Sequence, residues 1–178
     1  MIVASLLDAA MKNESFDLVN SLTFQLPAIV ICELLGIPLA RQWDIKRWSD
    51  GIANFSAAAL VSHAEARHAN ETAIEANAYL LELFVQLRKD PKDDLLSKLV
   101  TDTELDDSLS DSELVGLVVN LFFAGFETTE GLIGNAVVAL FRHPEQLRLV
   151  RQDPSLIENV IEETLRFDSS TLKQSRRI

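Results

Sequence analysis

The chain has 178 residues, enough for one domain of ordinary size and too few for two. Its hydrophobic fraction of 48% is sufficient for a buried core and excludes an intrinsically disordered chain. The 16 lysine and arginine residues against 27 acidic residues give a formal net charge of −11. Nucleic acids and anionic membranes need a positive surface, so we expect neither of them as a partner.

The cysteine and histidine content limits metal and redox chemistry. Cys32 is the one cysteine of the sequence, which excludes an intrachain disulfide and any cysteine-rich zinc or iron–sulfur site. The histidines at 63, 68 and 143 are too scattered to predict a metal cage. No secretory signal pattern opens the sequence, and no apolar run reaches the roughly 20 residues of a membrane span. We expect a cytoplasmic protein.

Helical patterns cover almost the whole sequence, and no pair of strands is evident. Helices are expected over 3–12 and 16–22, and another begins at Pro27 and ends at Gly36, a typical helix cap. The expected fold class is therefore mainly α. The tail from residue 168 has no helical stripe and is expected to form a strand in a larger context.

A long helix is predicted over 63–88. Within it, four apolar residues recur at spacings of three and four and predict the face that packs against the core; they are Ile74, Ala78, Leu81 and Val85. A short helix is expected over 95–100. The acidic segment 101–109 that follows is the best candidate for a flexible or cleavable loop.

The longest predicted helix begins at a capping box formed by Ser110 and Glu113 and continues to Phe141. It is apolar on nearly all sides over 114–126, which predicts a helix buried in the middle of the protein. A short helix is expected to begin at Pro144, and a last one covers 155–167.

Four of the six glycines lie inside this longest helix, at 116, 125, 131 and 134. Each costs about 1 kcal/mol of helix stability relative to alanine. One interpretation is close packing against neighbouring helices. The other is the close approach of a flat ligand to the bare backbone near Ala124 and Gly125.

Polar residues follow the apolar run directly, beginning with Glu127 and Thr128. An adjacent acid and alcohol that face a cavity could relay protons. Alternatively, the helix reaches the surface at this point, and Glu127 and Glu130 are solvated. The spacing leaves both interpretations open.

A second polar pair, Glu163 and Arg166, is three residues apart and shares one helix face. Exposed to water, such a pair contributes little to stability. Buried, it would form a fixed bidentate unit that organises nearby backbone. The spacing does not decide between these two cases.

These segments occur in the order found in one enzyme family. Residues 124–129, followed by residues 163–166, resemble the bacterial cytochrome P-450 family, whose members are haem-thiolate monooxygenases. Residues 139–147 resemble the stretch after the family's long central helix, and 26–38 resemble an earlier helix. The chain is therefore identified as the central part of a cytochrome P-450 fold, a single partial domain over 1–178.

The resemblance implies roles for six residues. Ala124 and Gly125 would pack beside the oxygen-binding face of the haem. Glu127 and Thr128 would be the acid–alcohol pair that delivers protons there. The pair at 163 and 166 would support the fold on the thiolate side. The resemblance also implies haem as the cofactor and an electron-donating redox partner.

The cysteine loop that provides the family's haem ligand is not found after residue 166. Cys32 lies in an apolar helix at a position that resembles a packing site. His63 and His68 are five residues apart, do not share a helix face well, and are expected to be solvated. The sequence predicts no metal ligand, and we expect the chain to be inactive alone.

Other interpretations remain open. The chain could be one half of a split monooxygenase that a second chain completes, a non-catalytic helical binding module, or a fragmentary record of a longer enzyme. Bare apolar faces of the central helix predict an oligomer, a complementary chain or a partly molten state. Basic residues at 142, 148 and 151 fit either a redox-partner face or ordinary surface cations. The sequence indicates neither the substrate nor the electron donor.

Overall fold

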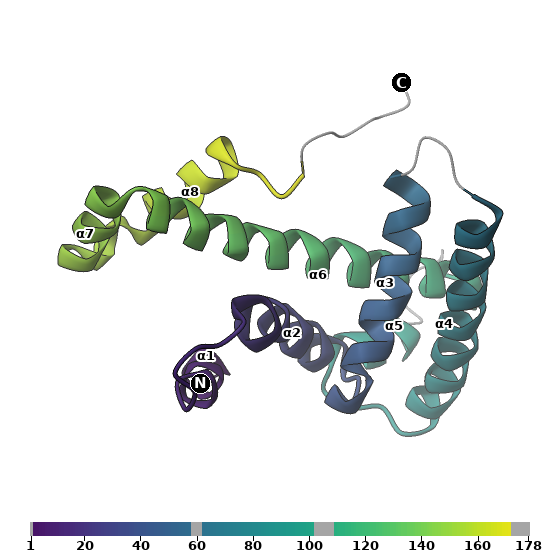
Figure 1. The fold of residues 1–178 in the computed structure, drawn as a ribbon. Helices are drawn as coiled ribbons and strands as arrows, with labels where there is room; N and C mark the ends of the chain where they lie inside the picture. The colour runs from purple at the N-terminus through teal and green to yellow at the C-terminus, as the bar shows by residue number, and fades with distance from the viewer. Residues whose placement is uncertain (1, 58–61, 102–108, 172–178) are drawn as a thin grey trace. The chain divides into compact units, whose positions relative to one another are not determined.

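The computed structural model describes residues 2–57, 62–101 and 109–171, and the side chains of all of these except 52–57. Every regular element in these ranges is a helix or a helical turn (Figure 1), so the predicted mainly-α class is confirmed. The chain divides into two compact units. We call Pro27–Phe126 the central unit, and Met1–Leu26 with Glu127–Ile178 the terminal unit. The expectation of a single partial domain stays a prediction.

Five helices make up most of the central unit. Their bounds are α2 (Gln25–Leu35, whose first two residues precede the unit), α3 (Gln42–Ala57), α4 (His63–Lys89), α5 (Leu95–Thr101) and the first half of α6 (Asp111–Arg142), with the turn η2 (Leu39–Arg41) between α2 and α3. Helix α2 begins two residues before the expected start at Pro27, and it ends at Leu35, directly before the expected stop at Gly36. Gly36 has a φ of +64°, a left-handed conformation that glycine adopts without strain.

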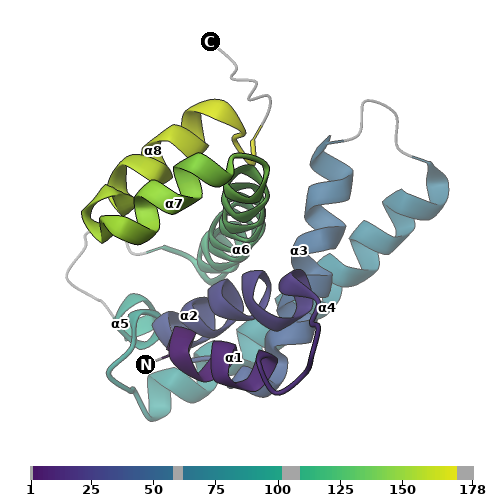
Figure 2. The same cartoon turned by 60° about the vertical axis from the view of Figure 1, so that its left-hand side comes forward.

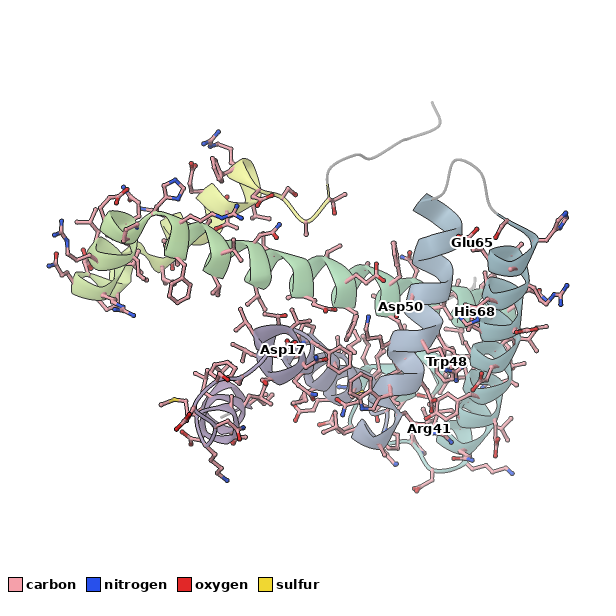
Figure 3. The ribbon with its side chains drawn as sticks, viewed as in Figure 1. Asp17, Arg41, Trp48, Asp50, Glu65 and His68 are labelled. Carbon is pink, nitrogen blue, oxygen red and sulfur yellow. The ribbon has the colours of Figure 1, made fainter. Side chains whose placement is uncertain are left out.

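Helices α3 and α4 lie side by side in both ribbon views (Figures 1 and 2). Gly51 of α3 allows this approach, because a side chain there would collide with the hydroxyl of Thr72 on α4. Trp48 of α3 is fully buried (Figure 3), with its ring centroid 5.5 Å from that of Tyr79 and 6.4 Å from that of Phe122. Aromatic packing thus joins α3, α4 and α6 into one core.

The buried face of α4 is not the one that the spacing predicted. The four residues of the expected stripe, Ile74, Ala78, Leu81 and Val85, are all exposed. The buried residues of this helix are instead Thr72, Ala76, Leu80, Phe84 and Leu87. Both sets have helical spacing, and the set that includes Phe84 and two leucines buries more apolar surface.

Helix α6 has 32 residues and begins at the predicted capping box. The Ser110 backbone N–H donates to Glu113 Oε2 at 2.8 Å, and the Glu113 N–H donates to Ser110 Oγ at 3.3 Å. The apolar run over 114–126 predicted that this helix is buried on nearly all sides, and among the described residues this is wrong. The buried residues follow one face of the helix; they are Leu114, Val115, Val118, Phe122 and Phe126.

The terminal unit contains short helices and the second half of α6. Its other elements are α1 (Ile2–Ala10), the π-helical turn η1 (Val19–Thr23), α7 (Pro144–Gln152), η3 (Pro154–Leu156) and α8 (Ile157–Phe167). The turn η1 replaces the helix expected over 16–22. Asn135 Nδ2 of α6 donates to the Asp168 carbonyl at 2.9 Å, and the His143 and Phe167 rings meet edge to face. These contacts hold the end of α8 against α6.

Two expectations fall mainly outside the described residues. Most of the acidic segment (102–108) and most of the tail (172–178) belong to the ranges that the structure does not describe. No helix in the described ranges is long and apolar enough to cross a membrane.

Candidate functional site

A bare strip of backbone is exposed midway along α6. Ala124 and Gly125 are both exposed, although Phe122 and Phe126 on either side of them are fully buried. A Cβ built on Gly125 would meet Ile31 Cδ1 at 3.5 Å, an ordinary contact distance. The strip therefore presents one methyl group and no larger side chain.

Close packing explains only one of the four glycines in α6. A Cβ on Gly131 would lie 3.1 Å from the Cβ of Ser170, which is a tight contact. At Gly116 and Gly134, a Cβ would meet nothing within 4 Å among the described residues. The packing interpretation thus holds for Gly131 and does not account for Gly125.

Glu127 and Thr128 follow the strip in α6 after one buried residue, Phe126. Both side chains are partly buried, whereas the neighbouring Thr129 is exposed. The boundary between the two compact units falls between Phe126 and Glu127. The structure therefore gives this acid–alcohol pair partial shielding from water. Its role in proton delivery stays a prediction.

Glu163 and Arg166 form a bidentate ion pair on α8. Arg166 Nε donates to Glu163 Oε2 at 2.7 Å, and Arg166 Nη2 donates to Glu163 Oε1 at 2.6 Å. This pairing lowers the pKa of the Glu163 carboxyl and raises the pKa of the Arg166 guanidinium. The side chains are 59% and 69% exposed, so in this chain the pair is of the exposed kind and stabilises the described fold little.

Cys32 has the environment of a packing residue. It is 1% exposed on α2, and burial raises the pKa of its thiol to about 11. A thiol of this pKa is protonated near neutral pH, and only the thiolate is a good metal ligand. His63 and His68 are exposed on α4, as expected. No group of acidic, histidine or cysteine side chains in the described residues could hold a metal ion.

Sequence reasoning missed a largely apolar hollow in the terminal unit. It has a volume of about 480 Å³ and lies between the end of α6, α7 and α8. Apolar residues such as Leu140, Val160 and Phe167 line it, and Glu163 and His143 are among its few polar groups. No pattern within a single helix pointed to it, because the lining residues come from three helices.

Comparisons with known proteins show the family of this chain. The family model for cytochrome P450 (cytochrome P-450) matches residues 9–178. A vitamin D(3) 25-hydroxylase of Pseudonocardia autotrophica is 43% identical over 86% of this chain and 36% of its own length. The 6-deoxyerythronolide B hydroxylase of Saccharopolyspora erythraea is 38% identical over 93% of this chain and 40% of its own.

A solved structure shows the same fold. The crystal structure of a myxobacterial cytochrome P-450 in complex with myristic acid matches with a TM-score of 0.87 and 33% identity. The match covers 94% of this chain and 41% of that one. The chain thus spans about two fifths of the length of the relatives that it matches. With a family match over nearly all of its residues, the chain belongs to the cytochrome P-450 family.

Proposed function

We propose that this chain forms the substrate-side, proton-delivering part of a haem-thiolate monooxygenase domain. The relatives named above are hydroxylases, and haem is the cofactor of the family to which the chain belongs. The observation that carries the proposal is the exposed Ala124–Gly125 strip of α6, followed after one buried residue by a partly buried acid and alcohol. A non-catalytic binding module is less well supported, because it gives these residues no role.

Ala124 and Gly125 would face the haem, and this chain has no available thiolate to bind its iron. The exposed strip at Ala124 and Gly125 leaves room for a flat group to approach the backbone of α6. The only sulfur that could serve as thiolate, that of Cys32, is buried and protonated. In the family, the bound haem supplies the chemistry that activates dioxygen. No catalytic step through it follows from this chain alone.

Glu127 and Thr128 are proposed to hold and pass protons. A carboxyl group can bind and release a proton, and a hydroxyl can donate and accept hydrogen bonds at once. Thr128 is four residues after Ala124 and Thr129 is four residues after Gly125, so helical spacing sets both near the exposed strip. Thr128 is the partly buried one of the two, and the role is therefore given to it. Glu163 and Arg166 have the structural role proposed from the resemblance.

The remaining proposals concern partners and setting. Large apolar side chains are exposed on α6, α7 and α8: Val138, Phe141, Leu149, Ile161, Leu165 and Phe167. A complementary chain or a further copy would cover them, and a redox partner would supply electrons to the assembled enzyme. The single cysteine is consistent with a cytoplasmic setting.

A chimera tests the proposed function. Residues 9–171 of this chain would replace the matching segment of the vitamin D(3) 25-hydroxylase relative. We expect the chimera to bind haem, and we expect Thr128→Ala to lower the product formed per dioxygen consumed. Thr129→Ala, at the exposed neighbour, is the matched control and should leave that ratio unchanged. Equal effects of the two substitutions would contradict the role given to Thr128.

A further inference from the structure

The exposed face of α4 carries an apolar stripe that the cytochrome P-450 site does not use. We define the α4 stripe as Ile74, Ala78, Leu81 and Val85; Ile74 is 62%, Leu81 38% and Val85 49% exposed. It follows a 27-residue helix on the side away from the buried residues Thr72, Ala76, Leu80, Phe84 and Leu87. A row of large apolar side chains on one helix face is typical of a surface that binds another protein.

The spacing of the stripe is that of a coiled-coil seam. Its members are separated by four, three and four residues, which matches two heptads with apolar residues at positions d, a, d and a. Because all of these side chains leave the same side of a straight helix, a second helix could lie along the row. Glu71 and Arg88 occupy the next seam position at either end.

From this pattern we propose that the α4 stripe docks a second copy of this chain in antiparallel orientation. A two-fold axis at the middle of the stripe would set Ala78 of one copy opposite Leu81 of the other. The same axis would set Ile74 opposite Val85. In each of these two facing pairs, a smaller side chain lies opposite a larger one. The surface is therefore complementary to itself, as a two-fold interface requires.

The charges at the two ends of the stripe favour this occupant and this orientation. Glu71 lies one turn before the apolar residues, and Arg88 and Lys89 lie one turn after them. In an antiparallel pair, Glu71 of each copy meets Arg88 and Lys89 of the other. Arg67, one turn before Glu71 on the same face, lies opposite position 92, beyond the end of α4. A parallel pair would set like charges opposite each other, which is destabilising. Arg88 pairs with Asp111 in its own chain and keeps 39% of its side chain exposed.

The contact is small. Four apolar residues per copy form a narrower interface than the roughly 1,200–2,000 Å² of a stable complex, so the dimer should dissociate on dilution. The α4 stripe shares no residue with the exposed apolar side chains of α6, α7 and α8 named above. Substitutions can therefore distinguish the two surfaces.

Sedimentation velocity of the 178-residue chain over a range of concentrations is the first test. We expect a reversible monomer–dimer equilibrium that Val85→Glu weakens at least tenfold. Val30→Glu is the matched control, because Val30 is also helical and is 48% exposed on α2; it should leave the equilibrium unchanged. A chain that stays monomeric, or a dimer that Val85→Glu does not weaken, would overturn the proposal.

Two further experiments test the orientation. Glu71→Lys and Lys89→Glu should each weaken the dimer, and the double variant should recover part of the loss, because opposite charges face each other again. In a mixture of the Ala78→Cys and Leu81→Cys variants, oxidation should link position 78 to position 81 in preference to like positions. Cys32 is buried and should not compete. Preferential links between like positions would contradict the antiparallel arrangement.

Discussion

The two adjacent leucines of α4 provide a sharp test of which face of this helix is buried. Leu80 is 0% exposed and packs into the core of the central unit, whereas Leu81 is 38% exposed on the outer face. Truncation of either residue to alanine removes the same atoms and changes the helix propensity equally. Any difference between the two variants therefore reports packing.

The expected difference is large. Leu80→Ala loses a fully buried side chain and leaves a cavity, so it should lower the free energy of unfolding by about 3 kcal/mol. Leu81→Ala should lower it by less than about 1 kcal/mol, because the removed atoms are partly in water. With a urea m-value of about 2 kcal/mol/M, the urea midpoint should fall by about 1.5 M in Leu80→Ala and by less than about 0.5 M in Leu81→Ala.

The assay is urea unfolding followed by circular dichroism, at a protein concentration low enough to keep the chain monomeric. Leu81→Ala serves as the matched control for Leu80→Ala. If the two variants lost equal stability, or if Leu81→Ala lost more, the outer face would be the buried one and the fold of α4 given above would be wrong.

Further predictions concern caps, glycines and pH. Gly36→Ala should lower the free energy of unfolding by more than about 1 kcal/mol, because alanine is strained at a φ of +64°. Gly116→Ala should raise the melting temperature, because a Cβ there meets open space among the described residues and alanine favours the helix. Ser110→Ala should lower the free energy of unfolding by about 1 kcal/mol, because the capping box is lost. Hydrogen bonds from Ser110 lower the pKa of the Glu113 carboxyl. The ionised carboxylate therefore stabilises the folded chain above the ordinary glutamate pKa near 4.5, and this stabilisation is lost as the pH falls through the lowered pKa. Urea midpoints between about pH 3 and pH 6 should show this loss in the parent chain and a smaller one in Glu113→Gln. Glu163→Gln should leave the melting temperature almost unchanged because the ion pair is exposed, and a large drop would contradict that assignment.

Local signals predicted the ends of the helices well. The capping box at Ser110 and Glu113, the stop at Gly36 and the helix start at Pro144 all depend on neighbouring residues, and the structure has them as expected. Backbone groups at a helix end must be satisfied within a turn or two, so the responsible residues are readable from the sequence.

Burial was harder to predict, because it depends on segments far apart in the sequence. Helix α4 carries two apolar rows of similar spacing, the exposed one that includes Leu81 and the buried one that includes Phe84. Packing of the second row with residues of other helices decides which one is buried. The hollow beside Val160 needs three helices to form, so periodicity within one helix could not reveal it. The glycine content indicated Ala124 and Gly125 as one of two interpretations, and the family resemblance gave them a role; their exposure on α6 is a result of the structure.

The absorption spectrum of the purified chain, expressed with sufficient haem and reduced under carbon monoxide, tests the central claim most directly. We propose that this chain carries the haem-facing strip and the acid–alcohol pair, whereas the sulfur of Cys32, its one cysteine, is buried and protonated. We therefore expect the band of a thiolate-ligated carbonyl complex to be absent. A strong band of this kind from the chain alone, abolished by Cys32→Ser, would contradict this expectation.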